Sequence, residues 1–370
     1  MLMPEKNIER TAKSFEIRSY HPGDEDAICA LFERVFGKPM GATESIRHWQ
    51  WEFLENPLKE TFIKLAWDNE MLVGQYAASP VQMYTDEGNI TAALSHDTMT
   101  DPQYGGHGIF RNTAEALYND QKKAGHNFIY GFPNRNSIHG FIKNLNWRQI
   151  MPAPVHIRPV RISKNISRRI FHSEQSSSPK DKEDVFCNPS ALFADKSGRY
   201  KLHIEKEFGD WADELWLRCC DQHRLWVIRD KTYLNWRYVK KPENKYNILS
   251  VWQGFQPVGY VVIACMDMNF GNTVFIMDFI VDLNFQNAAD LLIRYVVKTA
   301  KVNECAFASV LLTPGSKYRH IFRKKLFLPL PESLFPQPLY FGARCFEPSI
   351  NKLVHDPKAW SLSWGDNDVL

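Results

Sequence analysis

Three glycines within four residues, Gly105, Gly106 and Gly108, form the stretch whose residue types best suit the binding of an anion. They follow an expected strand that ends at Thr100 and precede an expected helix. Glycine tolerates positive φ and lets a ligand approach the backbone, and the first amides of a helix have no intrahelical partner. The spacing predicts a site for a diphosphate on the backbone N–H groups of residues 105–110. A glycine turn without a ligand is the alternative.

Two common nucleotide motifs do not fit this stretch. A P-loop requires Gly-Lys followed by Ser or Thr, and no such tripeptide follows these glycines. The dinucleotide fingerprint requires an early turn between a parallel strand and a helix. Here several strands of antiparallel appearance come first, so both motifs are excluded.

Titratable residues flank the glycines. His96 and Asp97 lie on the expected strand, and His107 lies inside the turn, where we expect it to be exposed. Adjacent strand residues point to opposite faces, so His96 and Asp97 are not expected to form a pair. One of them could face a cleft and act as a general base. An ordinary hydrogen-bonded strand residue is the alternative for each.

The sequence repeats itself at a constant offset of 185 residues. The segment WEFLENP at 51–57 matches WRYVKKP at 236–242, and Trp67, Val73 and Gly74 fall on Trp252, Val258 and Gly259. Such spacing predicts two copies of one fold. Between them, HSEQSSSPKDKED at 172–184 has the composition of a flexible linker.

The expected elements set the fold class and the domain limits. Each copy reads as α/β (α+β), with a mixed, mostly antiparallel sheet flanked by helices. Asp24 and Gly37 are expected to cap the first helix, and VHIRPVRI is expected to be the closing strand of the first copy. We predict a first domain over 1–165, a flexible polar linker over 166–197 and a second domain over 198–370.

This arrangement resembles the GNAT superfamily of acyl-CoA N-acyltransferases, in its tandem two-domain type. The family pattern is Arg or Gln, two residues, Gly, one residue, then Gly or Ala. Gln103-Tyr104-Gly105-Gly106-His107-Gly108 fits it literally, and a second register places Gly105, Gly108 and Phe110 at the three defined positions. We prefer the second register because the helix is expected to begin near Ile109. The stretch IYGFPNRNSIHGFIKNLNW at 129–147 is similar to the family's fifth strand and following helix.

The resemblance implies acetyl-CoA as the acyl donor, with no metal. It places the coenzyme against the fourth strand, the glycine turn and the segment after the fifth strand: Met99, Thr100, Gly105, Gly106, His107, Gly108, Ile109, Phe110, Asn134 and Asn136. A backbone amide near Met99 or Thr100 would polarise the thioester carbonyl. The family's tyrosine acid falls on Phe141 or Ile142, so Tyr104, Tyr130 or His139 would have to replace it.

The second copy departs from the family pattern. Its segment DLNFQNAADLLIRY at 282–295 has no glycine, and Asp282 and Asp290 would repel a diphosphate. We therefore expect a degenerate domain that binds no coenzyme and covers the acceptor cleft. A carboxylate from this domain, or the chain end near SWGDNDVL, could also enter the cleft.

Composition limits the partners. A net charge of +3 is too small to indicate nucleic acid, and no apolar run approaches the length of a membrane span. Seven cysteines without metal-type spacing suit reduced thiols, so we expect a cytoplasmic protein, with oligomerisation possible. The predicted acceptor is the primary amine of a small molecule, with an amino sugar as one candidate. The alternatives are a non-catalytic binding or scaffold protein, or an acyl-tRNA-dependent aminoacyl transferase.

Overall fold

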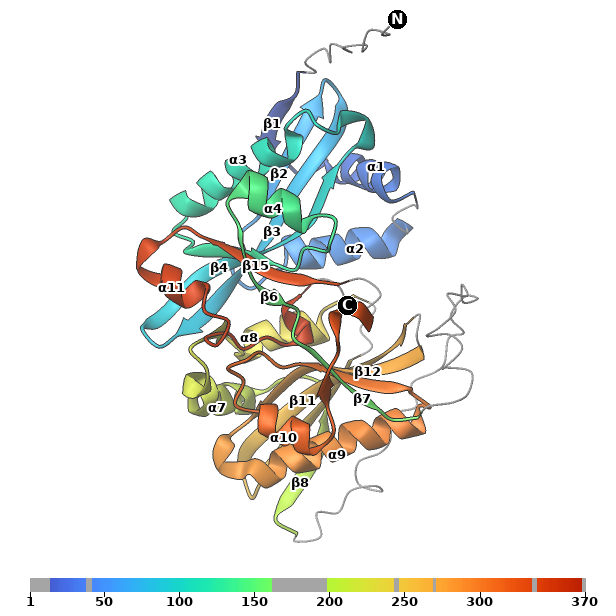
Figure 1. Ribbon diagram of the computed structural model, residues 1–370, viewed down its shortest axis with the longest axis vertical. Helices are drawn as coiled ribbons and strands as arrows, with labels where there is room; N and C mark the ends of the chain where they lie inside the picture. Colours follow the sequence, from blue (N-terminus) through green and yellow to red (C-terminus); the bar gives the residue numbers. More distant parts are fainter. Residues whose placement is uncertain are drawn as a thin grey trace, which may run out of the picture.

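The computed structural model describes residues 14–37, 42–161, 198–242, 246–268, 271–334 and 338–367. The chain forms two lobes, each built around one sheet, with helix α8 (Lys231–Leu234) and the C-terminal segment between them (Figure 1). The predicted linker, residues 166–197, lies outside the described residues. Among the described residues no helix is both long and apolar enough to cross a bilayer.

The first lobe contains an eight-stranded sheet of order β1-β2-β3-β4-β5-β15-β6, with β9 paired to β3. Only β4 and β5 pair in parallel along this order. The strands are β1 (Glu16–Ser19), β2 (Phe62–Asp68), β3 (Met71–Thr85), β4 (Gly88–Thr100), β5 (Phe128–Gly131), β6 (Arg148–Pro152), β9 (Leu225–Val227) and β15 (Tyr340–Cys345).

Helices cover both faces of this sheet, because successive side chains of β3 point to opposite sides. Tyr76 and Ala78 pack against α3 (Ile109–Lys123) and α4 (Ile138–Leu145). Ala77 packs against α1 (Glu25–Phe36) and α2 (Ala42–Phe53). Asp24 and Gly37 flank α1 as predicted, although the Asp24 carboxylate binds Arg18 instead of the helix amides.

The second lobe repeats the strand order in its seven-stranded sheet, β8-β10-β11-β12-β13-β7-β14. Its strands are β7 (Val155–Pro159), β8 (Tyr200–Glu205), β10 (Tyr246–Gln253), β11 (Gln256–Met268), β12 (Gly271–Val281), β13 (Phe307–Leu311) and β14 (Leu328–Pro329). Its helices are α7 (Asp210–Cys219), α9 (Gln286–Val302) and α10 (Arg319–Lys324), and α11 (Asn351–Val354) follows β15. The predicted fold class, with two mostly antiparallel sheets flanked by helices, is confirmed.

The two halves exchange one strand each. β7 leaves the first lobe and pairs with β13 and β14 in the second, whereas β15 pairs with β5 and β6 in the first (Figure 1). The repeat offset of 185 residues places β7 on β15, so the exchange is symmetrical. The prediction that residues 155–162 close the first sheet is therefore wrong. A local pattern indicates a strand but not the sheet that it joins.

The repeated tryptophans form the contact between the lobes. The rings of Trp51 and Trp236 stack with centroids 4.9 Å apart and an interplanar angle of 19°. The Trp51 Nε1 donates to the Trp236 carbonyl oxygen at 2.7 Å, and the Trp236 Nε1 donates to the Trp51 carbonyl oxygen at 3.0 Å. These reciprocal bonds satisfy both buried indole N–H groups and fix α2 relative to the π-helical turn Asn235–Val239, which directly follows α8.

Candidate active site

A cleft opens in the first lobe where β4 and β5 diverge. The two strands pair in parallel only as far as Leu94 and Tyr130. Beyond that point lies a cavity of about 450 Å³. Residues from β4, α3, the segment after β5 and α4 line it, together with Phe36 from α1: Ser95, His96, Thr98, Met99, Thr100, Phe110, Gly131, Phe132, Pro133, Asn134, Asn136, Ser137, Gly140 and Phe141.

The glycine turn lies after β4 and begins α3. Gly106 and Gly108 have φ of 83° and 80°, values that favour glycine, and Gly108 is the N-cap without a side-chain hydrogen bond. Gly105 and His107 donate to the carbonyls of Pro102 and Tyr104. The backbone N–H groups of residues 106 and 108–111 donate no hydrogen bond to any acceptor among the described residues. Five donors are thus available to an anion, and Phe110, the second residue of α3, lines the cleft.

A β-bulge in β4 re-orients the residues that precede the glycine turn. Asp97 has φ of 48°, and the register with β3 shifts at this point, between Gln75 and Ala77. The Asp97 carbonyl accepts from Gln75 Nε2 at 2.9 Å. Side chains 96 and 97 consequently do not point apart. His96, Asp97 and Glu52 of α2 each bring one ligand-type atom within 4.8 Å of the others, which corrects the expectation that the first two cannot meet.

His96 is the buried centre of this cluster. Its ring stacks on Phe53, with centroids 4.8 Å apart, and its Nε2 lies 2.8 Å from Ser79 Oγ. Its Nδ1 lies 3.4 Å from Glu52 Oε1. His48 Nε2 lies 3.9 Å from Glu52 Oε2, and burial lowers the pKa of His48 to about 4, with help from nearby cations of the second lobe. Such a carboxylate between two imidazoles can accept a proton, and with Asp97 the cluster could also hold a metal ion.

Glu52 is the residue that sequence reasoning missed. It lies in the repeated segment WEFLENP, where the second copy has Arg237 at the matching position. The available signal was the difference in charge at this position, acidic in the first copy and basic in the second, because packing alone does not require either charge.

The predicted acid candidates do not line the cleft. Tyr104 is buried, and its hydroxyl donates to Asp68 Oδ2 at 2.5 Å. Tyr130 packs among Phe128, Phe341 and Trp360 in the core between the lobes. His139 is exposed on α4. These three predictions are corrected. The sequence places these side chains near the motif but does not show whether they point into the cleft.

Most of the predicted coenzyme contacts surround the cleft. Met99, Thr100, Phe110, Asn134 and Asn136 line it. The Oδ1 atom of Asn134 accepts from the backbone of Asn136 at 2.9 Å, so it shapes the turn before α4. Gly105, Gly106, His107, Gly108 and Ile109 form the turn, and the Ile109 side chain is buried.

The second lobe has a counterpart of the cleft, but the chain itself fills it. β12 and β13 pair only as far as Phe275 and Ser309. Trp364 occupies the opening, with its ring 5.4 Å from that of Phe275 and its Nε1 donating to Ser309 Oγ at 3.2 Å. The remaining cavity is about 30 Å³. That volume suits a single water molecule.

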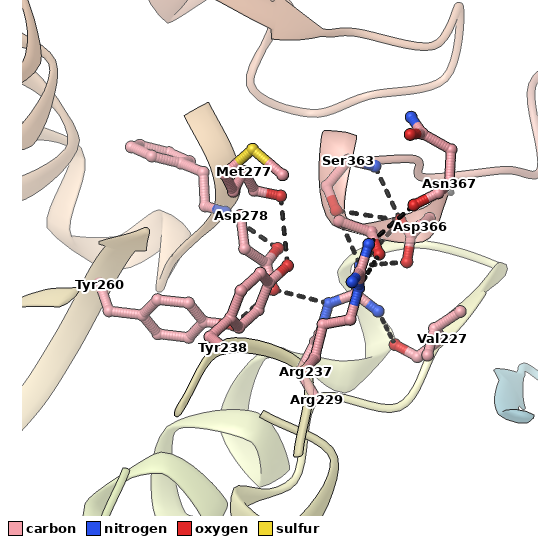
Figure 2. Close-up of polar contacts among 12 residues, drawn as sticks. Val227, Arg229, Arg237, Tyr238, Tyr260, Met277, Asp278, Ser363, Asp366 and Asn367 are labelled. Carbon is pink, nitrogen blue, oxygen red and sulfur yellow. Dashed lines mark hydrogen bonds and ion pairs between the residues drawn. The ribbon is translucent and has the colours of Figure 1, made fainter. Parts of the chain in front are cut away.

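The C-terminal segment is fixed in this place by a buried arginine (Figure 2). Arg229 Nε donates to Asp278 Oδ2 at 2.8 Å, and its Nη2 donates to Asp366 Oδ1 at 2.7 Å. Tyr260 Oη donates to the same Asp278 oxygen at 3.1 Å. The charged side chains of this triad are at most 3% exposed, so the two carboxylates share the single Arg229 guanidinium, and burial raises the pKa of Asp278.

The glycine turn also has no counterpart in the second lobe. The 3₁₀ turn Pro102–Tyr104 is separated from α3 by residues 105–108, whereas the 3₁₀ turn Leu283–Phe285 runs directly into α9. Asp101 and Asp282 cap these two turns in the same way. The second lobe therefore lacks the four-residue turn, in agreement with the absence of glycine in its sequence, whereas Asp282 caps a turn in the same way as Asp101.

The family comparison covers the first lobe, whereas the comparisons with solved structures cover most of the chain. Residues 16–150 match the family model of the acetyltransferase (GNAT) domain. The GCN5-related N-acetyltransferase of Anabaena variabilis is similar over 90% of this chain and 73% of that chain, at 11% identity and a TM-score of 0.61. That of Kribbella flavida covers 91% and 72%, at 12% and 0.60. No curated protein matches the sequence.

An N-myristoyltransferase has a similar fold as well. The Saccharomyces cerevisiae enzyme with bound myristoyl-CoA is similar over 89% of this chain and 82% of that chain, at 12% identity and a TM-score of 0.57. Residues 16–150 thus match the model of the GNAT acetyltransferase domain, and the chain as a whole has a fold similar to that of these two N-acetyltransferases.

Proposed function

We propose that this protein is an acyl-CoA-dependent N-acyltransferase that transfers a short acyl group, acetyl in the first instance, to the amine of a small molecule. One observation carries the proposal: five unoccupied backbone N–H groups at the start of α3 adjoin the cleft between β4 and β5. Charge-assisted hydrogen bonds from these donors suit the diphosphate of CoA. The cleft then receives the pantetheine arm along β4, where one of the amides of Met99 and Thr100 faces away from β3.

The closed end of the cleft supports a short acyl group. At Gly131, where β5 leaves β4, an added Cβ would lie 3.0 Å from the Ser95 carbonyl oxygen and 3.4 Å from Trp147 Cη2. The backbone and an indole ring therefore block the way between the strands. These close contacts beside Gly131 favour a short acyl group over a long chain.

The amine must lose a proton before it attacks the thioester. Glu52 is 14% exposed, stands between His48 and His96, and lies close to Asp97. The two carboxylates attract an ammonium group, and Glu52 accepts its proton directly or through water. We propose Glu52 as the base, with His96 and Ser79 holding it in place. The second lobe covers this side through the Trp51–Trp236 contact.

Binding and transfer can be measured separately. Titration calorimetry with CoA and acetyl-CoA tests the glycine turn, and thiol release on a panel of primary amines, amino sugars included, tests transfer. Glu52→Gln should lower kcat by about 10² or more with acetyl-CoA binding unchanged. Glu55→Gln is the matched control, because Glu55 follows the same helix but pairs with Arg47.

Each outcome decides one part of the proposal. Absence of CoA binding at millimolar concentration favours a scaffold protein. Binding without thiol release from any amine contradicts the small-molecule acceptor. Equal kcat for the Glu52 and Glu55 variants would remove Glu52 as the base.

A further inference from the structure

One group of side chains that could hold a metal ion lies beside the cleft, on the face of the sheet that α2 covers. Glu52, His96 and Asp97 each bring one ligand-type atom within 4.8 Å of the other two. Within the described ranges, no second group of three His, Cys, Asp or Glu side chains brings its ligand atoms this close. The His96 side chain is 1% exposed and that of Glu52 14%, and His96 also lines the cleft. The group is therefore shielded from bulk water but can be reached from the cleft.

The hydrogen bonds of Ser79 determine which nitrogen of His96 carries the hydrogen. Ser79 Oγ donates to the Glu52 carbonyl oxygen at 3.3 Å, and a hydroxyl has a single hydrogen to give. Ser79 Oγ must then accept from His96 Nε2, which lies 2.8 Å away. A neutral imidazole with its hydrogen on Nε2 has a lone pair on Nδ1. This Nδ1 is the atom that lies 3.4 Å from Glu52 Oε1, so a lone pair and a carboxylate face each other.

The distance between these two atoms suits two ligands of one ion better than a hydrogen bond. A charge-assisted N–H···O bond closes to about 2.7 to 2.9 Å. The buried His126 makes such a contact, with its Nε2 2.8 Å from Glu60 Oε2. Two ligands that each lie about 2.1 Å from a tetrahedral ion are roughly 3.4 Å apart. The 3.4 Å between His96 and Glu52 thus matches the spacing of two metal ligands.

The donor set selects the class of ion. One imidazole nitrogen and two carboxylate oxygens suit Zn²⁺ and similar divalent transition metals, whereas Mg²⁺ and Ca²⁺ take oxygen ligands. Three protein ligands with water in the fourth position form an open zinc site. The two negative charges of Glu52 and Asp97 also compensate the two positive charges of the ion, which lowers the cost of placing it in a largely buried position.

We propose that His96 Nδ1, Glu52 and Asp97 bind a divalent transition-metal ion of the Zn²⁺ class, and that the bound ion inhibits acyl transfer. Ion binding goes beyond the proposed function, whereas the inhibition rests on it. The electron pairs of Glu52 and His96 that take up the proton of the amine are the same pairs that hold the ion. The ion and the proton of a reacting amine therefore exclude each other.

Calorimetry with zinc chloride tests the site without any acyl donor. The wild type should bind Zn²⁺, and Asp97→Asn and His96→Gln should each bind it at least about tenfold more weakly, because loss of a group that only supports a metal ligand already costs about 10- to 100-fold. Asparagine tolerates the positive φ of residue 97, so Asp97→Asn keeps the bulge. His126→Gln is the matched control. It removes a buried imidazole that faces one carboxylate without a third ligand, and it should bind Zn²⁺ as the wild type does.

The binding experiment has clear contrary outcomes. Absence of Zn²⁺ binding to the wild type would overturn the site. Equal affinities of the wild type and Asp97→Asn would also overturn it, because the ion would then be held elsewhere, for example by the sulfurs of Cys265 and Cys305, which lie 3.2 Å apart. Mg²⁺ binding as tight as that of Zn²⁺ would contradict ligation by the imidazole.

A transfer assay tests the inhibition, with the acylated amine measured by mass spectrometry because Zn²⁺ also binds the released thiol. Zn²⁺ should inhibit the wild type and His126→Gln, and EDTA should restore both. Zn²⁺ bound at the site without inhibition would overturn the second half of the proposal. Absence of CoA binding would overturn the acyl-CoA function and the inhibition with it, whereas the calorimetric result for the ion would stand.

Discussion

A charge placed at Gly108, the N-cap of α3, tests the predicted anion site directly. Gly108 has φ of 80°, and an added Cβ would meet only Asn112 Nδ2, at 3.6 Å. A side chain therefore fits in space, and any residue other than glycine costs about 1 kcal/mol of backbone strain. Gly108→Glu and Gly108→Gln share this strain and differ only in charge.

Coulomb's law gives the magnitude of the charge effect. At a separation of roughly 5 Å and an effective dielectric constant between 20 and 80, one phosphate charge opposes the carboxylate by about 1 to 3 kcal/mol. Gly108→Glu should therefore bind CoA about 5- to 150-fold more weakly than Gly108→Gln. Without ligand, Gly108→Glu should be the more stable of the two variants, because an acidic residue at a helix N-terminus contributes about 0.3 to 1 kcal/mol of stability.

Calorimetry with CoA measures the affinities, and thermal unfolding without ligand measures the stabilities. The difference in affinity should shrink in 1 M salt, where the Debye length is about 3 Å. Equal affinities of the two variants at low salt would refute the reasoning, since a diphosphate on the N–H groups of residues 106 and 108–111 has to sense this charge.

Further predictions address the base, the lobe contact and stability. His96→Gln should lower kcat by about 10² in the thiol-release assay with little change in KM for acyl-CoA, because His96 positions the base and lies away from the glycine turn; an equal loss in KM would contradict this. Trp51→Phe and Trp236→Phe should each destabilise in urea, with a coupling of about 1 kcal/mol in the double mutant, and simple additivity would argue against the reciprocal bonds. Burial lowers the pKa of His223 to about 4. The contribution of the neutral His223 to the free energy of unfolding is complete above pH 6.5 and falls as the pH drops toward 4, by about 2 kcal/mol at pH 5. In His223→Gln, the free energy of unfolding measured in urea should therefore depend less on pH over this range. Calorimetry should give one CoA per chain, because Trp364 fills the second cleft, and two sites would refute this.

The sequence determined the features that depend on neighbouring residues. The glycines at 105, 106 and 108 predicted a turn before a helix, and Gly37 was identified as the end of α1. Gly37, Gly106 and Gly108 have positive φ, a backbone conformation that depends on the absence of a Cβ. The offset of 185 residues predicted two similar halves, since the same local pattern builds the same strands and helices.

Only the tertiary structure decided how these elements combine. β7 and β15 have similar patterns, and pairing across the lobes, not composition, assigns each to the other half's sheet. The bulge at Asp97 depends on the register with β3, and it reverses the direction that simple alternation predicts. Glu52 reaches His96 because α2 packs on the face of the sheet where the His96 ring lies. Contacts between residues far apart in sequence arise from packing of whole elements, and a single sequence carries no direct record of them.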